Sequence, residues 1–369
     1  MPEIGTETMN SNTDKIKLNH MRQLSAYREQ LLAHPILKFL FLELTLRCNE
    51  RCIHCGSSCG DVPSDEMSLE QYRKILDEIA GDFDVGSFQL CITGGEPLMR
   101  RDFFDIMAYA HELGYNWGMT SNAVLIDKAA ARRLRETGMR TISVSIDGLK
   151  ETHDAFRRTP GAYDGAMRGI SNLLEEGGFE HVQVTTVINH RNMDELDRLY
   201  EIFLGMDIDS WRVIGVEPIG RALDHPEILL DSRDWKRLFD FIREKRMQDM
   251  PVTYGCSHYL GLDYEREVRE HYYLCNAGIY VASIMVNGDI GSCLDIEKRP
   301  ETVQGNILKD RFKDVWEQRF EIFRQERAEL NGICRSCGVK DFCHGGATHS
   351  WDFDRNEPRV CFKDIFHMK

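Results

Sequence analysis

The sequence lacks an apolar stretch long enough to cross a membrane and lacks an apolar signal core in Met1–Leu18. A spanning helix needs about 18 or more consecutive apolar residues. Basic residues are outnumbered as well, because 46 Lys and Arg stand against 60 Asp and Glu, a net charge of −14. An acidic chain argues against a broad nucleic-acid-binding surface. These absences predict a cytoplasmic protein with no membrane span and no nucleic-acid partner.

Cysteine, in contrast, is plentiful, with 12 residues in a chain of 369. Without a secretory signal, such thiols indicate a reducing compartment, where they serve as metal ligands or catalysts rather than in disulfides. The length suits one large domain and a smaller one, each with its own core.

Six apolar, β-branched runs alternate with helical patterns over the first two thirds of the chain. This alternation predicts parallel strands joined by right-handed helical crossovers. The six runs are Phe39–Leu46, Phe88–Thr93, Asn116–Thr120, Thr141–Ile146, Val182–Ile188 and Trp211–Val216.

Capping residues set the expected helix starts between these strands. Ser68 with Gln71 forms a capping-box pattern, and Asp102 and Asp127 precede two further helices, of which the second ends at Gly138. Two more helices are expected over Asp164–Glu176 and Asp194–Leu204.

Polar residues gather where the predicted strands end. In a parallel α/β barrel these carboxyl ends carry the chemistry. Six units rather than eight predict a partial (β/α)6 barrel with an open side, suited to a bulky substrate. The polar ends are Cys48–Cys55, Gly94–Pro97, Thr120–Asn122, Ser145–Gly148, Asn189 and Glu217–Pro218.

After Arg221 the alternation is expected to stop, and a charged, mostly helical connector should follow. Asn287-Gly288 between two apolar runs predicts a β-hairpin, and a helix should then span Phe312–Leu330. The cysteine-rich tail, Cys334–Cys361, has little apolar periodicity and is expected to need metal to hold its shape. The predicted domains are a polar and helical lead-in (1–36), the barrel (37–223), the connector (224–270) and the extension (271–369).

Cys48, Cys52 and Cys55 stand in the spacing C-x3-C-x2-C directly after the first apolar run. Three thiolates can hold three irons of a [4Fe–4S] cube and leave the fourth iron open. A structural zinc site would need a fourth protein ligand, for which His54 and Cys59 are the nearest candidates.

This triplet, followed by Gly94-Gly95-Glu96-Pro97 after the second strand, resembles the radical S-adenosylmethionine (SAM) superfamily. His153–Arg157 and Glu217–Ala222 add to the resemblance, which covers roughly residues 39–221. The cysteines further on resemble the SPASM extension, which carries auxiliary iron–sulfur clusters. Its pattern appears as C-x12-G-x4-C and then C-x2-C-x5-C with a last cysteine, at Cys275, Gly288, Cys293, Cys334, Cys337, Cys343 and Cys361.

One ligand position departs from the SPASM pattern, because Ala347 stands where a further cysteine is expected. By resemblance, Cys334, Cys337, Cys343 and Cys361 still make a complete set for one auxiliary cluster. The other set keeps only Cys275 and Cys293, so one or two auxiliary clusters are expected. Cys256, His344 or His349 could replace the lost ligand, the cluster could keep an open iron, or it could be absent.

The resemblance implies that Cys48, Cys52 and Cys55 are the catalytic cluster ligands and that SAM is cleaved reductively to a 5′-deoxyadenosyl radical. Gly94 and Gly95 should let the backbone approach SAM, and Glu96 should accept a hydrogen bond from its ammonium group. Ser145 and Arg157 are expected to hold the methionine carboxylate. The alternatives without a SAM contact are a backbone-capping role for Ser145 and a solvated basic pair for Arg157 with Arg158.

The function expected from this resemblance is modification of a peptide or protein, by crosslinking, epimerisation or oxidation. A tetrapyrrole or small cofactor-precursor oxidase is the enzymatic alternative, and a metal-stapled structural module is the non-enzymatic one. A reducing electron donor such as flavodoxin or ferredoxin is an expected partner. Before residue 38 only a short amphipathic helix, Met21–Leu32, is expected, so peptide recognition would need a separate protein or direct docking.

Overall fold

The computed structural model describes residues 12–60, 65–255 and 258–366. The helices of four or more residues and of α type are α1 (Asn12–Ala33), α2 (Leu69–Asp82), α3 (Phe103–Glu112), α4 (Lys128–Glu136), α5 (Lys150–Arg157), α6 (Ala162–Glu176), α7 (Leu196–Leu204), α8 (Ser232–Lys245), α9 (Gly261–Tyr264), α10 (Phe312–Gln318), α11 (Glu321–Arg324), α12 (Gly332–Arg335), α13 (Lys340–Cys343) and α14 (Phe362–Ile365). The strands are β1 (Phe39–Glu43), β2 (Gln89–Thr93), β3 (Asn116–Ser121), β4 (Met139–Ser145), β5 (His181–Ile188), β6 (Ser210–Gly215), β7 (Val252–Tyr254), β8 (Val281–Ile284), β9 (Asp289–Gly291), β10 (Gly305–Asn306), β11 (Trp351–Asp352) and β12 (Glu357–Pro358).

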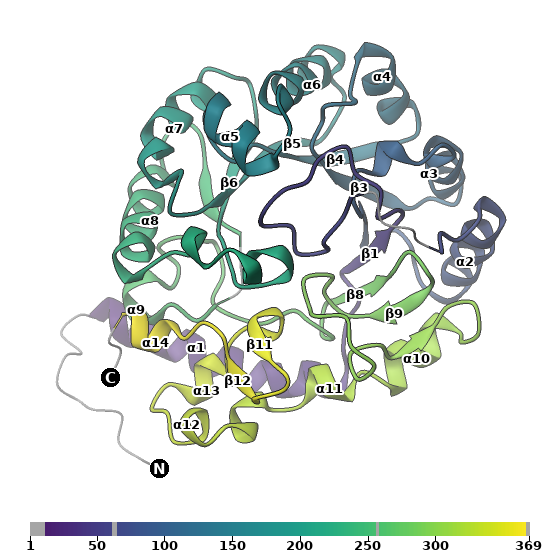
Figure 1. Ribbon diagram of the computed structural model, residues 1–369. Coiled ribbons are helices and arrows are strands. Elements are labelled where there is room, and N and C mark those ends of the chain that lie inside the picture. The colour runs from purple at the N-terminus through teal and green to yellow at the C-terminus, as the bar shows by residue number, and fades with distance from the viewer. Residues whose placement is uncertain (1–11, 61–64, 256–257, 367–369) are drawn as a thin grey trace.

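A curved sheet in the order β10-β9-β8-β1-β2-β3-β4-β5-β6-β7 forms the centre of the molecule. Strands β1 to β6 are parallel neighbours in chain order, and helices α2 to α8 surround them on the outside (Figure 1). The predicted partial barrel of parallel strands is therefore confirmed, and all six expected strands are present within one to three residues of their predicted bounds.

The sheet extends beyond the six predicted strands at both edges. After α8, β7 pairs in parallel with β6, so the expectation that the alternation stops at Arg221 was wrong by one unit. At the other edge β8 pairs in parallel with β1, and β9 and β10 follow it in antiparallel pairs. The sheet thus crosses the predicted domain boundary at residue 270. Strands β8 and β9 form the hairpin predicted at Asn287-Gly288, whereas β7 and β10, of three and two residues, are too short to show a period of two in the sequence.

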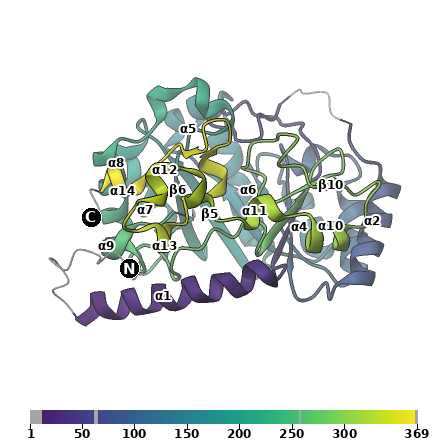
Figure 2. The same ribbon diagram turned by 90° about the horizontal axis from the view of Figure 1, so that it is seen from below.

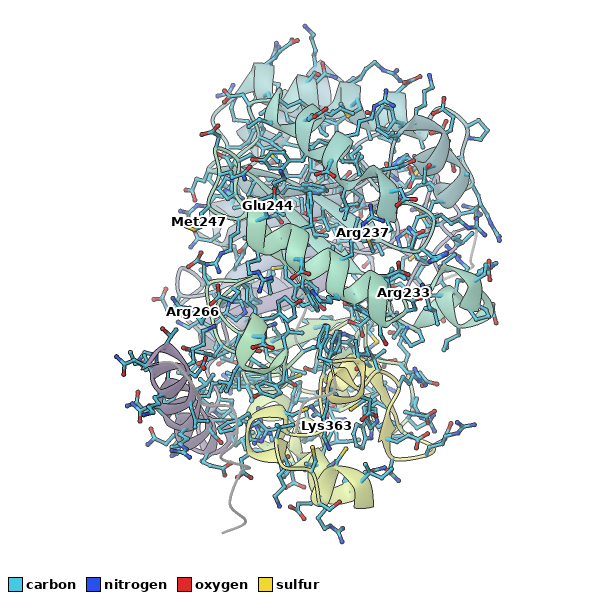
Figure 3. All side chains as sticks on the ribbon, turned by 90° about the vertical axis from the view of Figure 1, so that its left-hand side faces the viewer. Arg233, Arg237, Glu244, Met247, Arg266 and Lys363 are labelled. Carbon is cyan, nitrogen blue, oxygen red and sulfur yellow. The ribbon has the colours of Figure 1, made fainter. Side chains whose placement is uncertain are left out.

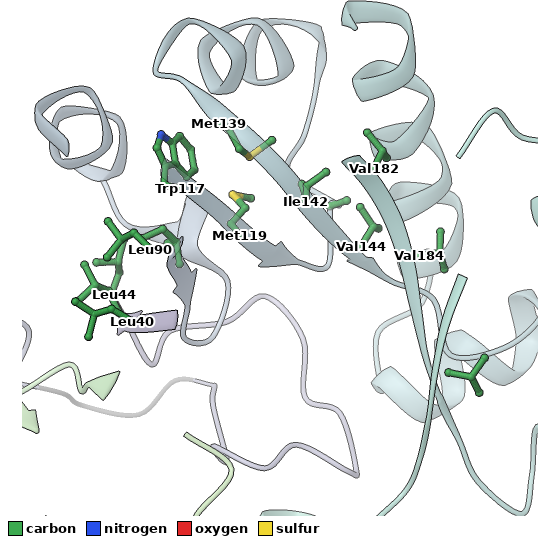
Figure 4. Packing of buried hydrophobic residues seen from close by; sticks show 14 of the residues in the cluster. Leu40, Leu44, Leu90, Trp117, Met119, Met139, Ile142, Val144, Val182 and Val184 are labelled. Atoms are coloured by element: carbon green, nitrogen blue, oxygen red, sulfur yellow. The ribbon is translucent and has the colours of Figure 1, made fainter. Parts of the chain in front are cut away.

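The two faces of the barrel strands differ because successive side chains point to opposite sides. Leucine, isoleucine and valine side chains point outward and pack under the helices, as the close view of the core shows (Figure 4). The intervening side chains face the barrel interior and are more often polar, and several of them hydrogen-bond one another. Gln89 Nε2 donates to Thr141 Oγ1 at 2.8 Å, and the Ser143 and Thr185 hydroxyls lie 2.5 Å apart.

Most predicted helix starts are confirmed, with one exception. Ser68 and Gln71 form the expected reciprocal capping box, and the Asp127 carboxylate accepts from Ala130 N–H at 2.8 Å. Asp102 makes no capping bond to α3, because its carboxylate pairs with the Arg100 guanidinium at 2.7 Å. On the side of the molecule, α8 presents Arg233, Arg237 and Glu244 outward (Figure 3) while its opposite face is buried.

The N-terminal helix is longer than predicted and belongs to the C-terminal region in space. It begins at Asn12 instead of Met21, and residues 1–11 of the predicted lead-in lie outside the described residues. Seen from below, α1 runs along one side of the molecule (Figure 2). Leu18 and Met21 pack with Val339 and Phe342 of the tail. Among the described residues, no helix has the length and apolar character needed to cross a membrane.

The helix predicted over Phe312–Leu330 is broken, which corrects that prediction. Three short pieces replace it: α10, α11 and a 3-10 turn at Arg327–Leu330. Its predicted apolar stripe is nevertheless fully buried, at Phe312, Val315, Trp316, Phe320 and Phe323. The break lets Phe323 reach the loop at Gly278, where a Cβ would stand only 2.6 Å from the Phe323 side chain.

Candidate active site

The loop that carries Cys48, Cys52 and Cys55 follows β1 and lies across the mouth of the barrel (Figure 1). Backbone hydrogen bonds hold it at several points. Cys48 N–H donates to Gly60 O at 3.3 Å, and Ile53 N–H donates to Phe156 O at 3.0 Å. The second of these bonds ties the loop to the last turn of α5, so the fold itself positions the three thiols.

The three thiols differ in their protonation preference. Burial raises the pKa of Cys48 to about 11 and that of Cys52 further still. A hydrogen bond from the Cys59 side chain lowers the pKa of Cys55 to about 6 despite burial, and Cys59 N–H also donates to Cys55 Sγ at 3.4 Å. Cys59, which the sequence offered as a candidate fourth ligand, therefore lies in direct contact with Cys55 of the triplet.

A second loop, Gly94–Glu96 after β2, packs against the start of the cysteine loop. Gly95 N–H donates to Thr45 O at 2.7 Å, and Glu96 N–H donates to Arg47 O at 2.9 Å. A Cβ at Gly94 would lie 2.2 Å from Thr45 O, and one at Gly95 would lie 2.1 Å from Arg47 O. The two glycines are thus required by the neighbouring backbone, a reason different from the close approach to SAM predicted from the sequence.

Glu96 is buried beside the cysteine loop, at the ends of β2 and β3. Its carboxylate accepts from Ser121 Oγ at 3.0 Å and from Asn122 N–H at 2.9 Å. Burial raises the pKa of Glu96 to about 7 although these bonds oppose the shift. The Asn122 side-chain amide lies 3.9 Å from Cys48 Sγ. Ser121 and Asn122 were not singled out as site residues, although their place at a strand end was a usable signal.

Arg157 lies beneath the cysteine loop in a buried ion-pair network. Its guanidinium lies 2.8 Å from Glu50 Oε2 and 2.6 Å from Asp147 Oδ2. Burial alone would lower the pKa of Arg157, but Asp147, Cys52 and Glu50 raise it well above its usual value. Arg157 is buried, so it does not form the solvated basic pair with Arg158 that was the alternative interpretation. Its predicted contact with a methionine carboxylate stays a prediction, since two protein carboxylates already engage it.

The network around Arg157 includes buried atoms without a hydrogen-bond partner in the described residues. These atoms are Glu50 Oε1, His54 Nδ1 and His153 Nε2, and the His54 ring stacks on Phe156 with ring centroids 4.4 Å apart. Leaving such atoms without a hydrogen bond costs free energy.

Ser145, the last residue of β4, is half-buried and stands in register with Thr185.

A third loop, after β6, closes over the cysteines. Arg221 Nε donates to Cys52 O at 2.8 Å, and Arg221 Nη1 donates to Cys59 O at 2.8 Å. Gly220 has φ +51°, and a Cβ there would lie 2.4 Å from Cys55 O. Arg221 thus fixes the cysteine loop, a contact that was not predicted from the sequence.

In the tail, four cysteines from separate short elements surround one cavity. Cys334 lies in α12, Cys343 ends α13 and Cys361 precedes α14, and together with Cys337 these three line the same pocket. Four convergent thiols are the donor set of a complete iron–sulfur cluster. The structure brings together the four residues that the sequence grouped.

Cys275 and Cys293 do not line that cavity. Cys275 Sγ lies 3.2 Å from Thr348 Oγ1, next to Ala347, which is fully buried. Burial would raise the pKa of Cys275, but Arg327 and the Thr348 hydrogen bonds lower it to about 7. Cys293 has the opposite shift, because burial raises its pKa.

The candidates for the lost ligand separate in the structure. His344 Nδ1 pairs with Glu326 at 2.9 Å, whereas His349 Nε2 pairs with Glu217 at 3.0 Å. His349 also lies near Cys293, where its charge opposes the rise in the pKa of that thiol that burial causes. Cys256 lies outside the described residues.

The residues present fit the expected iron–sulfur groups. The barrel loop offers three free thiols and the tail cavity four, and sulfur ligands are what iron–sulfur clusters take. The partnerless buried atoms at Glu50, His54 and His153 lie beside the barrel triplet, as a site for a polar cofactor requires.

Comparisons with known proteins agree with this donor set. A model of the radical SAM superfamily matches residues 42–203, and a model of the SPASM iron–sulfur cluster-binding domain matches residues 275–338. Mycofactocin maturase MftC of Mycolicibacterium smegmatis is 33% identical over 312 residues, which cover 82% of this chain and 76% of MftC. The chain belongs to the radical SAM superfamily.

This radical SAM protein is also similar to a heme synthase in sequence and to SuiB in fold. An AdoMet-dependent heme synthase of Methanosarcina barkeri is 29% identical over 344 residues, covering 87% of this chain and 95% of the relative. The structure of Streptococcus suis SuiB bound to SAM superposes with a TM-score of 0.73 at 20% identity, covering 95% of this chain and 83% of SuiB. The chain is therefore a radical SAM enzyme with a SPASM domain. Its cofactors are SAM, a [4Fe–4S] cluster and auxiliary iron–sulfur.

Proposed function

We propose that this radical SAM enzyme modifies a peptide or protein by crosslinking, epimerisation or oxidation. The observation that carries the proposal is an open groove of about 600 Å³ at the carboxyl end of β1. The groove begins at Leu46, two residues before Cys48. It runs along the β8–β9 hairpin, so a bound chain would pass beside the cysteine loop.

The walls of this groove suit an extended peptide. Half of the lining residues are apolar, such as Met285, and the others are polar or carry both charge signs, with Asp289 opposite in sign to Lys298 and Arg299. Lys298 is anchored by Glu43, with Nζ 2.8 Å from the carboxylate. The 33% identity to a peptide maturase supports the same substrate class.

In this proposal Cys48, Cys52 and Cys55 hold the SAM-binding cluster. Bound there, cluster and SAM supply reductive cleavage of the sulfonium and a 5′-deoxyadenosyl radical that removes hydrogen from the substrate. Cys59 and Arg221 fix the loop, and Arg157 holds it from below through Glu50.

The remaining proposed SAM contacts lie at strand ends around the loop. Glu96 accepts a hydrogen bond from the SAM ammonium, and the Gly94-Gly95 backbone and Ser145 border the methionine part. Arg157 is the least available of these groups, because its guanidinium already contacts two carboxylates. Its effect on the SAM carboxylate is electrostatic in this proposal.

The tail is proposed to hold one auxiliary cluster on Cys334, Cys337, Cys343 and Cys361. Cys275 and Cys293 would contribute to a second cluster that lacks the usual ligand at Ala347. We further propose a cytoplasmic location, a flavodoxin or ferredoxin as electron donor, and domain boundaries near residues 36, 223 and 270, although β7 continues the barrel sheet past residue 223 and β8 joins it from beyond residue 270.

A tetrapyrrole is the second candidate substrate, and one observation favours it. The heme synthase relative matches over 95% of its own length, so this chain contains nearly the whole of that framework. The same assay distinguishes the two candidates.

The test is an anaerobic assay of 5′-deoxyadenosine formation by the reconstituted enzyme with SAM and dithionite. Its substrates are the peptides encoded beside the gene and, in a parallel reaction, iron-coproporphyrin III. A peptide that stimulates the reaction and changes in mass supports the proposal, and turnover of the porphyrin alone overturns it. Cys48→Ala should abolish the reaction. Cys91→Ala, which changes a thiol on β2 that belongs to neither the loop nor the tail set, is the matched control.

A further inference from the structure

A carboxylate and two imidazoles converge in the interior at a place that the cysteine sets do not explain. Glu217 Oε1 lies 2.7 Å from His258 Nε2, and Glu217 Oε2 lies 3.0 Å from His349 Nε2. All three ligand atoms lie within 4.8 Å of one another. The Glu217 and His258 side chains are 4% and 2% exposed, so the group is shielded from bulk water.

The three residues come from parts of the chain that are far apart in sequence. Glu217 follows β6 at the carboxyl end of the barrel, His258 follows β7, and His349 lies in the tail between α13 and β11. The segment 347–349 is where the tail lacks its expected cysteine. There the chain presents Thr348 to Cys275 and His349 to Glu217.

Two imidazole nitrogens and a carboxylate oxygen are a donor set that zinc takes readily. Zinc binds such ligands at about 2.0–2.2 Å in a tetrahedron, which places neighbouring ligand atoms roughly 3.4 Å apart. The two oxygen-to-nitrogen distances, 2.7 and 3.0 Å, are those of direct hydrogen bonds and are shorter than that value, and the rings of His258 and His349 stand 5.7 Å apart, edge to face. Small side-chain rotations would separate the ligand atoms enough to admit the ion, and a water molecule would supply the fourth ligand of the tetrahedron.

The charge of the group is consistent with a cation. Glu217 is a buried carboxylate with two imidazoles as hydrogen-bond partners. Histidine ligands must be neutral to bind metal, and a divalent cation would then supply the positive charge that the buried carboxylate needs.

We propose that Glu217, His258 and His349 form a binding site for a divalent transition-metal cation, with zinc as its representative. The ion fastens the C-terminal tail to the barrel at the end of β6. This inference assigns His349 to the ion and not to the second auxiliary cluster, for which His349 was also a candidate ligand. It is independent of the substrate, because the three ligands lie outside the barrel cysteine triplet and the tail cavity.

Zinc binding to the full-length, untagged enzyme tests the proposal after its thiols have been occupied by anaerobic iron and sulfide reconstitution. The probe is Zn²⁺, buffered in the micromolar range. We expect one zinc per chain, and zinc-edge X-ray absorption should show nitrogen and oxygen ligands near about 2.0–2.1 Å. His349→Gln and Glu217→Gln should each weaken zinc binding at least about 100-fold, while Glu217→Asp keeps part of the affinity.

His190→Gln is the matched control, because His190 also pairs with a carboxylate, Asp234, but on the surface at 2.9 Å. It should leave zinc binding unchanged. Iron content and circular dichroism report whether each variant folds, and the Glu217 variants decide the result if His349→Gln does not. The proposal is overturned if the wild type binds no zinc, if the zinc has sulfur ligands near about 2.3 Å, or if the folded variants bind it as well as the wild type does.

Discussion

The two cysteine-bearing regions of this enzyme are built in opposite ways. The barrel loop at Cys48–Cys55 is held by strand ends, by α5 and by Arg221. The tail at Cys334–Cys361 consists of one-turn helices and a two-residue strand pair. In the barrel the fold positions the thiols, whereas in the tail we expect the thiols and their metal to hold the fold together.

Packing explains the difference. The strands around the loop are covered by a large apolar core that continues from β1 to β7, and Figure 4 shows the part of it from β1 to β5. The tail contributes few residues to any core; Val339 and Phe342 rest on α1, while Ile333 is 79% exposed. An iron–sulfur cluster in the cavity between the four thiols would replace the apolar core that the tail lacks.

The largest expected effect is on activity and belongs to the barrel loop. Cys48→Ala removes one of three proposed cluster ligands, so SAM cleavage should fall at least about 1,000-fold, or roughly 4 kcal/mol in barrier. Iron should drop by about four atoms per chain, while the tail keeps its iron. A variant that still cleaves SAM at the wild-type rate would refute the assignment of the triplet.

The next effect compares a buried arginine in the barrel with an exposed one in the tail. Arg157→Met leaves the buried Glu50 and Asp147 carboxylates unpaired, so unfolding free energy should fall by about 3–5 kcal/mol. Arg335→Met removes a pair with Glu329 whose arginine is 61% exposed, and should cost at most about 1 kcal/mol. Denaturant unfolding of both variants measures the contrast, and equal losses would contradict it.

Metal removal should destabilise the tail more than the barrel, whereas the two preceding changes have their larger effect in the barrel. In the chelated protein we expect amide exchange in 332–365 to become at least about 100-fold faster, because the tail has little else to hold it. Strands β2 to β5 should keep their protection. Hydrogen exchange followed by mass spectrometry checks this, and a tail that stays protected without iron would show that its own packing is sufficient.

The same contrast explains what could be predicted from the sequence. The strands and the capping box at Ser68 were predictable because they depend on local periodicity and on nearby side chains. The short strand β7, the edge pairing of β8 with β1 and the break after α10 depend on distant partners, such as Phe323 against Gly278. No local pattern records such contacts.

The candidate site likewise contains residues that the sequence could predict and contacts that it could not. The cysteine spacings identified both thiol sets, and the strand-end rule located Glu96. The partners of Arg157 and the loop contacts of Arg221 could not be predicted, because they join residues up to 169 positions apart. The requirement for Gly94 was recognised, but its cause is the Thr45 carbonyl, which only the folded chain brings near.

A pair of glycines extends the comparison to backbone strain. Gly94→Ala would place a Cβ 2.2 Å from Thr45 O at φ +140°, whereas Gly346→Ala in the tail meets no atom within 4 Å at φ +84°. The first should destabilise the enzyme by about 3 kcal/mol or more and the second by about 1 kcal/mol. Thermal unfolding of the two variants measures this, and a larger loss for Gly346→Ala would reverse the ranking of the two regions.

The smallest effect is a pH dependence confined to the barrel site. Because burial raises the pKa of Glu96 to about 7, the carboxyl is mostly protonated at pH 6 and mostly ionised at pH 8. Only the ionised form attracts the SAM ammonium, so SAM affinity should rise about tenfold from pH 6 to pH 8. Equilibrium binding of SAM to the oxidised enzyme measures this, and Glu96→Gln should bind weakly with a flat profile.

Glu326, which lies beside the tail, provides the control for this last prediction. Burial would raise the pKa of Glu326, but the hydrogen bond and charge of His344, together with the charge of Arg28, lower it, so this carboxylate stays ionised over the same range. Glu326→Gln should therefore leave the pH profile of SAM binding unchanged. A profile that moves with Glu326 but not with Glu96 would place the titrating group in the tail, and the proposed ammonium contact of Glu96 would then be wrong.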